Sequence, residues 1–137
     1  MTIYETSSDI DNEVRAIPKI EAKFNCRAQR LKKLSNCDYA FTRDNVLVAM
    51  GEFKKRSVSK SAYKSYMLSA SKYANILVIA KALDVPALLI VEWTDETGYL
   101  TLGSKAPKAG VGGRKDRGDV SDTEIVVYFP IEDFIKL

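Results

Sequence analysis

The spacing of apolar residues along the chain predicts two helical stretches. Residues 7–23 carry apolar side chains at helical spacing, after a serine that can cap the helix and two aspartates that favour its first turn. Pro18 lies inside this stretch and predicts either a kink or a division into two short helices. A longer helix is predicted over residues 59–83, with Ser59 as its cap and Asp84 just after its end.

Alternating apolar and polar residues, by contrast, predict strands. Residues 24–31 alternate, and two more strands at 36–43 and 45–56 are separated by a turn sequence at residues 43–45. Residues 86–93 form a continuous apolar run, which is typical of a strand covered on both faces. Two further strands are predicted at residues 98–103 and 124–131. The order of helix, three strands, helix and strand predicts an α/β sandwich around a mixed sheet.

A glycine-rich basic segment separates the last two predicted strands. Residues 103–122 contain five glycines and five Lys or Arg residues, with few apolar side chains. Strand-like sequence resumes afterwards, so we expect a flexible loop inside a single domain that spans residues 1–137. Such a loop suits sequence-independent contact with phosphates, and it is equally typical of a solvated loop.

The residue types exclude several classes of chemistry. The chain has no histidine, which excludes a Ser-His-Asp triad, a histidine base and histidine-ligated zinc. Its two cysteines, Cys26 and Cys37, have no metal-site spacing and are expected to be small buried residues. The net charge is only +3, but basic residues gather at 27–33, 54–64 and 105–117, which is compatible with a polyanionic partner.

Neither secretion nor membrane insertion is predicted. The first residues are acidic where a signal peptide would be basic and then apolar. The longest apolar stretch is interrupted by Lys81, Asp84 and Pro86, so it does not read as a membrane span. We therefore expect a cytoplasmic protein.

The candidate chemistry lies at the end of the strand predicted over residues 45–56. Side chains alternate along a strand, so Glu52 and Lys54 share one face while Phe53 points to the other. A three-residue hairpin loop would place Asp38 of the preceding strand on the same face, diagonally beside Glu52. A two-residue loop without a bulge would place the two carboxylates on opposite faces.

Two adjacent carboxylates repel each other unless a cation lies between them. Oxygen ligands suit Mg²⁺, or Mn²⁺ as a substitute, and such an ion can activate water and neutralise charge on a phosphate. A nearby lysine can then hold or deprotonate that water. The alternative is an ordinary solvated strand end, in which Asp38 only begins a strand or caps a turn.

These residues carry a resemblance. "CDYAF…GEFKKR", followed by a helix and an apolar strand, resembles the PD-(D/E)XK nuclease superfamily, including its small phage-type and Holliday-junction-resolvase-like members. The resemblance implies a restriction-endonuclease-like α-β-β-β-α-β core with a mixed central sheet flanked by helices. It also implies that Asp38, Glu52 and the Phe53 carbonyl bind Mg²⁺ and that Lys54 assists the water. Cys37 stands where the motif often has proline.

The resemblance, which covers residues 9–102, implies further site residues. Many members carry a metal-linked glutamate on the first helix, and Glu13 is the preferred match, with Glu21 as the alternative. The segment "YMLSASKYA" resembles the second helix of small phage nucleases, making Lys72 a candidate either to support a metal ligand or to contact a phosphate. Other basic residues expected to contact nucleic acid are Lys55, Arg56, Lys60 and Lys64.

The leading hypothesis is therefore a Mg²⁺-dependent endonuclease that hydrolyses DNA, either non-specifically or by recognising DNA structure. It would act in the host cytoplasm if it is encoded by a phage. The alternative is a non-catalytic module that binds nucleic acid or protein on the same fold. DNA is not distinguished from RNA, nor duplex from branched substrate, nor endonuclease from exonuclease, and a homodimer is compatible with cutting two strands.

Overall fold

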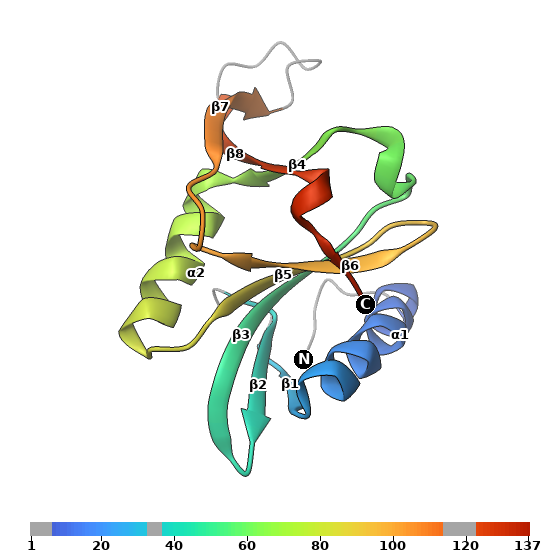
Figure 1. Ribbon diagram of the computed structural model, residues 1–137, viewed down its shortest axis with the longest axis vertical. Coiled ribbons are helices and arrows are strands. Elements are labelled where there is room, and N and C mark those ends of the chain that lie inside the picture. Colours follow the sequence, from blue (N-terminus) through green and yellow to red (C-terminus); the bar gives the residue numbers. More distant parts are fainter. Residues whose placement is uncertain (1–6, 33–36, 114–122) are drawn as a thin grey trace.

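The computed structural model describes residues 7–32, 37–113 and 123–137, and its description of side chains begins at Ala16 (Figure 1). Two α-helices and two short 3₁₀ turns are present in these residues: α1 Ser7–Phe24, α2 Ala70–Ala82, η1 Lys60–Ala62 and η4 Ile131–Asp133. The strands are β1 Arg27–Arg30, β2 Tyr39–Arg43, β3 Val46–Lys55, β4 Ser65–Ser69, β5 Ala87–Glu92, β6 Thr97–Leu102, β7 Lys108–Gly113, β8 Thr123–Pro130 and β9 Ile135–Lys136.

A mixed six-stranded sheet forms the centre of the molecule. Its strand order is β1-β2-β3-β5-β6-β9, with β3 and β5 parallel and the other neighbours antiparallel. β3 and β5 are adjacent and parallel because the chain between them crosses over through α2, as parallel strands require. This arrangement confirms the predicted α-β-β-β-α-β core and its mixed sheet.

The two helices cover opposite faces of this sheet. α1 packs Ala16, Ile17 and Ile20 against one face, where Phe41 and Ile90 are also buried. α2 lies on the other face with a second, smaller sheet, as Figure 1 shows at the upper left. β3 and β5 are therefore covered on both sides, which accounts for the continuous apolar run of β5.

The second sheet corrects the prediction of one long helix over residues 59–83. Ser59 makes no side-chain cap, the following residues form only a 3₁₀ turn, and residues 65–69 form β4. Its side chains alternate, with Tyr66 and Leu68 buried and Met67 exposed. α2 begins only at Ala70, after Ser69, whose hydroxyl accepts a hydrogen bond from the Lys72 amide. The spacing of apolar residues here fits both a helix and a strand. These residues form a strand because they pair with the distant strand β8.

The prediction of a loop over residues 103–122 is also wrong in part. Residues 108–113 form β7, which pairs with β8 over its whole length, while residues 114–122 lie outside the described residues. Strand pairing here uses backbone hydrogen bonds and needs few apolar side chains. A side chain at Gly110 would place its Cβ 3.0 Å from the Tyr128 ring, so glycine is needed for the ring to pack over β7.

The extent of α1 and the end of α2 agree more closely with the predictions from the sequence. α1 continues through Pro18 as one helix and is not divided into two. α2 ends before Asp84, whose φ of 55° cannot continue a right-handed helix. No helix in the described ranges is long and apolar enough to cross a membrane.

Candidate active site

β3 carries the candidate chemistry from the core to the surface. Glu52 is 1% exposed, whereas the side chain of Lys54, two residues further along the same face, is 36% exposed. Phe53 points to the opposite face and packs in the core beneath α1. The glutamate is thus held by a strand that is fixed on both sides, and the lysine lies where that face opens to solvent.

The hairpin between β2 and β3 decides on which face Asp38 lies. Its loop has two residues, Asp44 and Asn45, both at positive φ. Such a loop alone would put Asp38 and Glu52 on opposite faces, but Val48 is an extra residue in β3 that forms a bulge. The bulge shifts the register by one residue and returns the two carboxylates to the same face.

Two hydrogen bonds then hold Asp38 against β3. Its backbone N–H donates to the Gly51 carbonyl at 3.0 Å, and the Phe53 N–H donates to its Oδ2 at 2.9 Å. Continuation of the register places Asp38 directly opposite Glu52. The structure therefore brings together Asp38, Glu52 and the backbone of Phe53, three of the predicted metal ligands.

The Glu52 carboxylate is buried without hydrogen bonds. Neither of its oxygens accepts a hydrogen bond of acceptable geometry from a described residue. Two ammonium groups approach Oε1 as ion pairs: Lys72 Nζ at 2.6 Å and Lys54 Nζ at 3.7 Å. A buried carboxylate oxygen without a partner is costly in a folded protein, so Oε2, which the two lysines leave without a hydrogen bond, points to a missing cation or proton.

Burial and charge perturb the ionisation of this group. Burial raises the pKa of Glu52 and the neighbouring Asp38 carboxylate raises it further, while Lys72 and Lys54 lower it less strongly. The pKa of Lys72 is raised because the attraction of Glu52 and Asp38 outweighs its own burial. Two carboxylates in one partly buried site therefore destabilise each other until positive charge is placed between them.

The donor set fits a hard divalent cation. Carboxylate and carbonyl oxygens are the ligands that Mg²⁺ and Mn²⁺ prefer, and Oε2 of Glu52 has no hydrogen-bond partner among the described residues. The described residues contain no group of three acidic, cysteine or histidine side chains that could hold a metal. The side chain of Glu13 lies outside the described residues. Its helix packs on the sheet face opposite Glu52.

Glu21, the alternative acid of the first helix, has a visible contact. Its Oε2 accepts a hydrogen bond from the Ala28 backbone N–H at 2.9 Å. That bond ties the end of α1 to β1. It gives Glu21 a structural role at the edge of the sheet.

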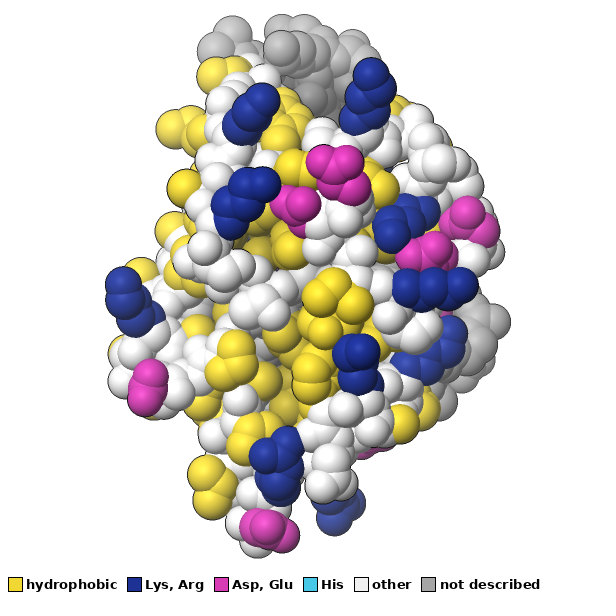
Figure 2. Space-filling model, viewed as in Figure 1, with side chains coloured by type: hydrophobic (Ala, Val, Ile, Leu, Met, Phe, Trp, Pro, Cys, Tyr) yellow, Lys and Arg dark blue, Asp and Glu magenta, His cyan; other side chains and the backbone are white. Residues whose placement is uncertain are grey.

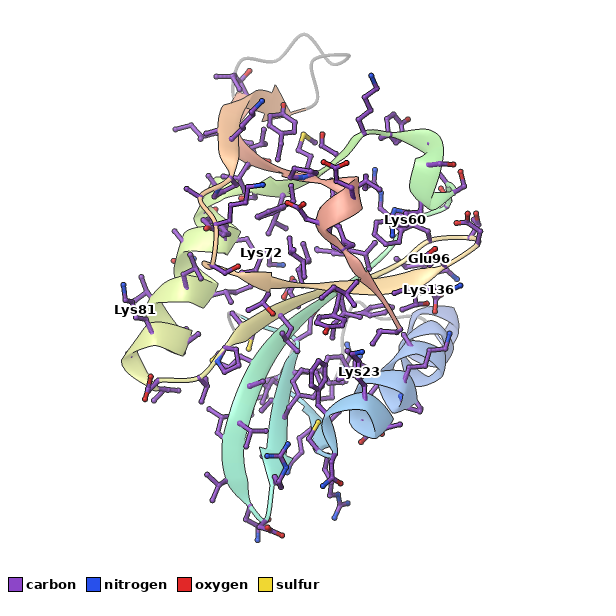
Figure 3. The ribbon with its side chains drawn as sticks, in the orientation of Figure 1. Lys23, Lys60, Lys72, Lys81, Glu96 and Lys136 are labelled. Atoms are coloured by element: carbon purple, nitrogen blue, oxygen red, sulfur yellow. The ribbon has the colours of Figure 1, made fainter. Side chains whose placement is uncertain are left out.

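Of the side chains predicted to contact nucleic acid, three form ion pairs with glutamates and two are exposed without an ion pair to a described residue. Lys72 pairs with Glu52 inside the site, and Lys55 lies 3.9 Å from Glu92. Lys60 is held by Glu96 at 2.8 Å, with its ammonium also near the Trp93 ring, which fixes η1 to the β5–β6 turn (Figure 3). Two others are exposed: Arg56 and Lys64.

Arg56 is positioned by an aromatic residue of β4, Tyr66, which is buried. Its guanidinium lies over the ring of Tyr66, 5.5 Å from the ring centre. Burial raises the pKa of Tyr66 to about 12, the nearby guanidinium lowers it, and the Glu52 carboxylate adds a smaller upward shift. Tyr66 therefore links the exposed Arg56 to the region of Glu52. The alternation of buried and exposed side chains along residues 65–69 is the sequence signal for this role, but the same residues also fit the spacing of a helix.

A comparison with protein-family models agrees with this geometry. Residues 2–137 match the model described as "Phage putative PDDEXK endonuclease". The chain belongs to this family. The match confirms the resemblance to the PD-(D/E)XK nucleases and covers nearly the whole chain.

A solved structure shows that this phage endonuclease family member shares its fold with an archaeal protein. The structure is that of Hjc, a Holliday junction resolvase from Archaeoglobus fulgidus, with a TM-score of 0.55 and 11% sequence identity. The similarity covers 88% of this chain and 90% of the resolvase. No curated protein matches the sequence. The low identity means that the structural similarity establishes the fold alone.

Proposed function

We propose that this chain is a Mg²⁺-dependent DNA endonuclease whose site is built from Asp38, Glu52, Lys54 and Lys72. The observation that carries the proposal is the buried Glu52 carboxylate, which faces Asp38 and accepts no hydrogen bond from a described residue. Membership of the PD-(D/E)XK family supports the same reaction class. Mn²⁺ would substitute for Mg²⁺ because both prefer oxygen ligands.

Each residue has a distinct task in this proposal. Asp38, Glu52 and the Phe53 carbonyl hold the metal ion, with Glu13 as a fourth candidate ligand. When bound, the ion supplies a water of lowered pKa and neutralises charge that develops on the phosphate. Lys54, at the exposed end of the same face, holds or deprotonates the attacking water.

Lys72 and the surface cations position the site and the substrate. Lys72 keeps Glu52 ionised and oriented through the 2.6 Å ion pair. Lys55, Arg56 and Lys64 would contact DNA phosphates without reading sequence. The ammonium of Lys60 is already held by Glu96, so we assign Lys60 to structure.

A cleavage assay tests this function. Wild type, Lys54→Ala and the control Lys81→Ala would be incubated with plasmid, linear duplex, single-stranded and branched DNA, and with RNA, in Mg²⁺, Mn²⁺ or EDTA. Lys81 is an exposed lysine at the far end of α2 from Lys72 (Figure 3). We expect metal-dependent cutting by the wild type and by Lys81→Ala, and a loss of about 10²-fold or more in Lys54→Ala.

The outcomes separate the proposals. Equal cutting by Lys54→Ala would reject the site. Metal-independent DNA binding without cutting would favour the alternative, a non-catalytic binding module. A preference for branched DNA over linear duplex would identify structure selectivity, and sedimentation of the active species would establish whether it is a dimer.

A further inference from the structure

A pocket lies between the two sheets, away from the carboxylate site. Its volume is about 830 Å³, and it is lined by β6, the connection from β6 to β7, the end of β8 and the segment that continues into β9. Figure 1 shows where the segments that line it lie, among them the β6–β7 connection and the η4 turn. Glu52 is not among its lining residues, so this pocket is separate from the proposed metal site.

The walls of the pocket present flat apolar surfaces. The Tyr128 ring and the two prolines Pro107 and Pro130 contribute to them, whereas the Phe129 side chain points into the core on the other face of β8. The Tyr128 ring lies so close to Gly110 that a Cβ there would be 3.0 Å from it. An aromatic ring face favours the stacking of a planar group.

The rim of the pocket is basic. Lys64, Lys105 and Lys108 line it from two separate segments of the chain, and Asp133 is the one carboxylate among its described lining residues. That carboxylate lies 3.5 Å from Lys105. Lys64 and Lys108 form no ion pair with a described residue. Figure 2 shows Lys and Arg side chains bordering apolar surface on this face.

We propose that this pocket binds a nucleotide, either free or as an unpaired residue of a DNA strand. The base would stack on the apolar walls beside Tyr128. Its edge would meet the hydroxyls of Ser65 and Ser104, which also line the pocket. The phosphate would lie between Lys64 and Lys108, whose ammonium groups supply charge-assisted hydrogen bonds.

Other ligand classes fit these features less well. A simple anion would use the lysines but leave the apolar walls in water, and a fatty acid would require a more enclosed apolar cavity without hydroxyls. The volume lies within the range of about 300–1,000 Å³ that is usual for small-molecule sites. The inference needs neither the metal nor cleavage, so it stands apart from the proposed catalytic function.

Calorimetric titration in EDTA tests the proposal without any contribution from metal-dependent cutting. The probes are dAMP, dTMP, inorganic phosphate and a short oligothymidylate, added to wild type and three variants. Lys64→Ala/Lys108→Ala removes the phosphate contacts, and Ala106→Trp fills the pocket from its exposed connection. Lys81→Ala is the matched control, and circular dichroism verifies that every variant is folded.

We expect dAMP to bind the wild type and Lys81→Ala equally. Its affinity should fall about tenfold or more in the double lysine variant, because two charge-assisted contacts are lost, and should fall similarly in Ala106→Trp. Competition between dAMP and the oligothymidylate would identify an unpaired strand as the source, and its absence would identify a free nucleotide. Affinity for phosphate equal to that for dAMP, no dAMP binding at millimolar concentration, or unchanged affinity in both variants would overturn the proposal.

Discussion

Two lysine–glutamate pairs in this protein have nearly equal distances and opposite character. Lys60 meets Glu96 at 2.8 Å, and Lys72 meets Glu52 at 2.6 Å. Glu96 is 21% exposed and accepts a hydrogen bond from its lysine, whereas Glu52 is 1% exposed and accepts none from the described residues. Figure 3 shows Lys60 with Glu96 at the β5–β6 turn and Lys72 at the beginning of α2.

The difference between the pairs lies in what surrounds the carboxylate. Water and a well-oriented ammonium satisfy Glu96, so its pair joins two surface turns. Glu52 is buried and faces a second carboxylate, Asp38, so the ammonium groups of Lys72 and Lys54 do not fully offset the cost of burying its charge. The first arrangement contributes to stability, whereas the second costs stability and is explained by a function that needs the charge.

The largest difference between the two pairs should appear in the cleavage rate when each glutamate is replaced by glutamine. Glu52→Gln removes a proposed metal ligand and should lower the cleavage rate by about 10³-fold, the effect of losing several kcal/mol of stabilisation by the metal. Glu96→Gln should leave the rate nearly unchanged. Initial rates on the preferred DNA substrate measure both, and equal losses would contradict the distinction.

Removal of the lysines should have different effects on stability without metal. Lys72→Met leaves a buried carboxylate without its nearest cation and should lower the free energy of unfolding in EDTA by about 1–3 kcal/mol. This range allows for the 38% exposure of the Lys72 side chain. Urea unfolding provides the measurement. Lys72→Met/Glu52→Gln should regain most of the loss, and an unchanged loss in that double variant would mean that Lys72 acts through other contacts.

Removal of the buried charge itself should stabilise the metal-free protein. Glu52→Gln in EDTA should unfold at higher urea than the wild type, by about 1 kcal/mol, because a desolvated charge opposite Asp38 is gone. The pKa of Glu52 is raised in the folded state, so folding favours its protonated form and the wild type gains stability as the pH falls. The advantage of Glu52→Gln should therefore be largest near neutral pH and shrink toward pH 4.5, the ordinary pKa of the group. An advantage independent of pH would assign it to packing.

Loss of the surface pair between Lys60 and Glu96 should have the smallest effect on the free energy of unfolding. Lys60→Met should lower the free energy of unfolding by about 0.2–1 kcal/mol, as is typical of a partly exposed ion pair, and the loss should diminish at high salt. Thermal unfolding at two salt concentrations measures it. A loss larger than that of Lys72→Met would reverse the assignment of the two pairs.

Much of the part of the molecule that carries the candidate site could be predicted from local sequence patterns. β3 and β5 are recognisable because burial on one or both faces dictates their apolar residues, and Glu52 and Lys54 follow from the alternation of a strand. The position of Asp38 could not be settled because it depends on the bulge at Val48. Val48 is an apolar residue between the apolar residues Leu47 and Ala49, so nothing in its type marks it as the extra residue.

The second sheet shows where local patterns are insufficient. The sequence from Ser65 to Ser69 fits a helix and a strand equally, and its partner β8 is about sixty residues away in the chain. The pocket beside it is assembled from Lys64, the β6–β7 connection and the end of β8. These segments become neighbours only after both sheets have formed, so local periodicity could not place their side chains together.

Mn²⁺ binding measured by calorimetry tests the central claim most directly, because it asks whether the buried Glu52 carboxylate is a metal ligand. Wild type, Asp38→Asn, Glu52→Gln and the control Glu96→Gln would be titrated without DNA. We expect wild type and Glu96→Gln to bind the ion with the same affinity and Asp38→Asn and Glu52→Gln to lose most of it. Equal binding by all four proteins would contradict the account, as would no binding by the wild type.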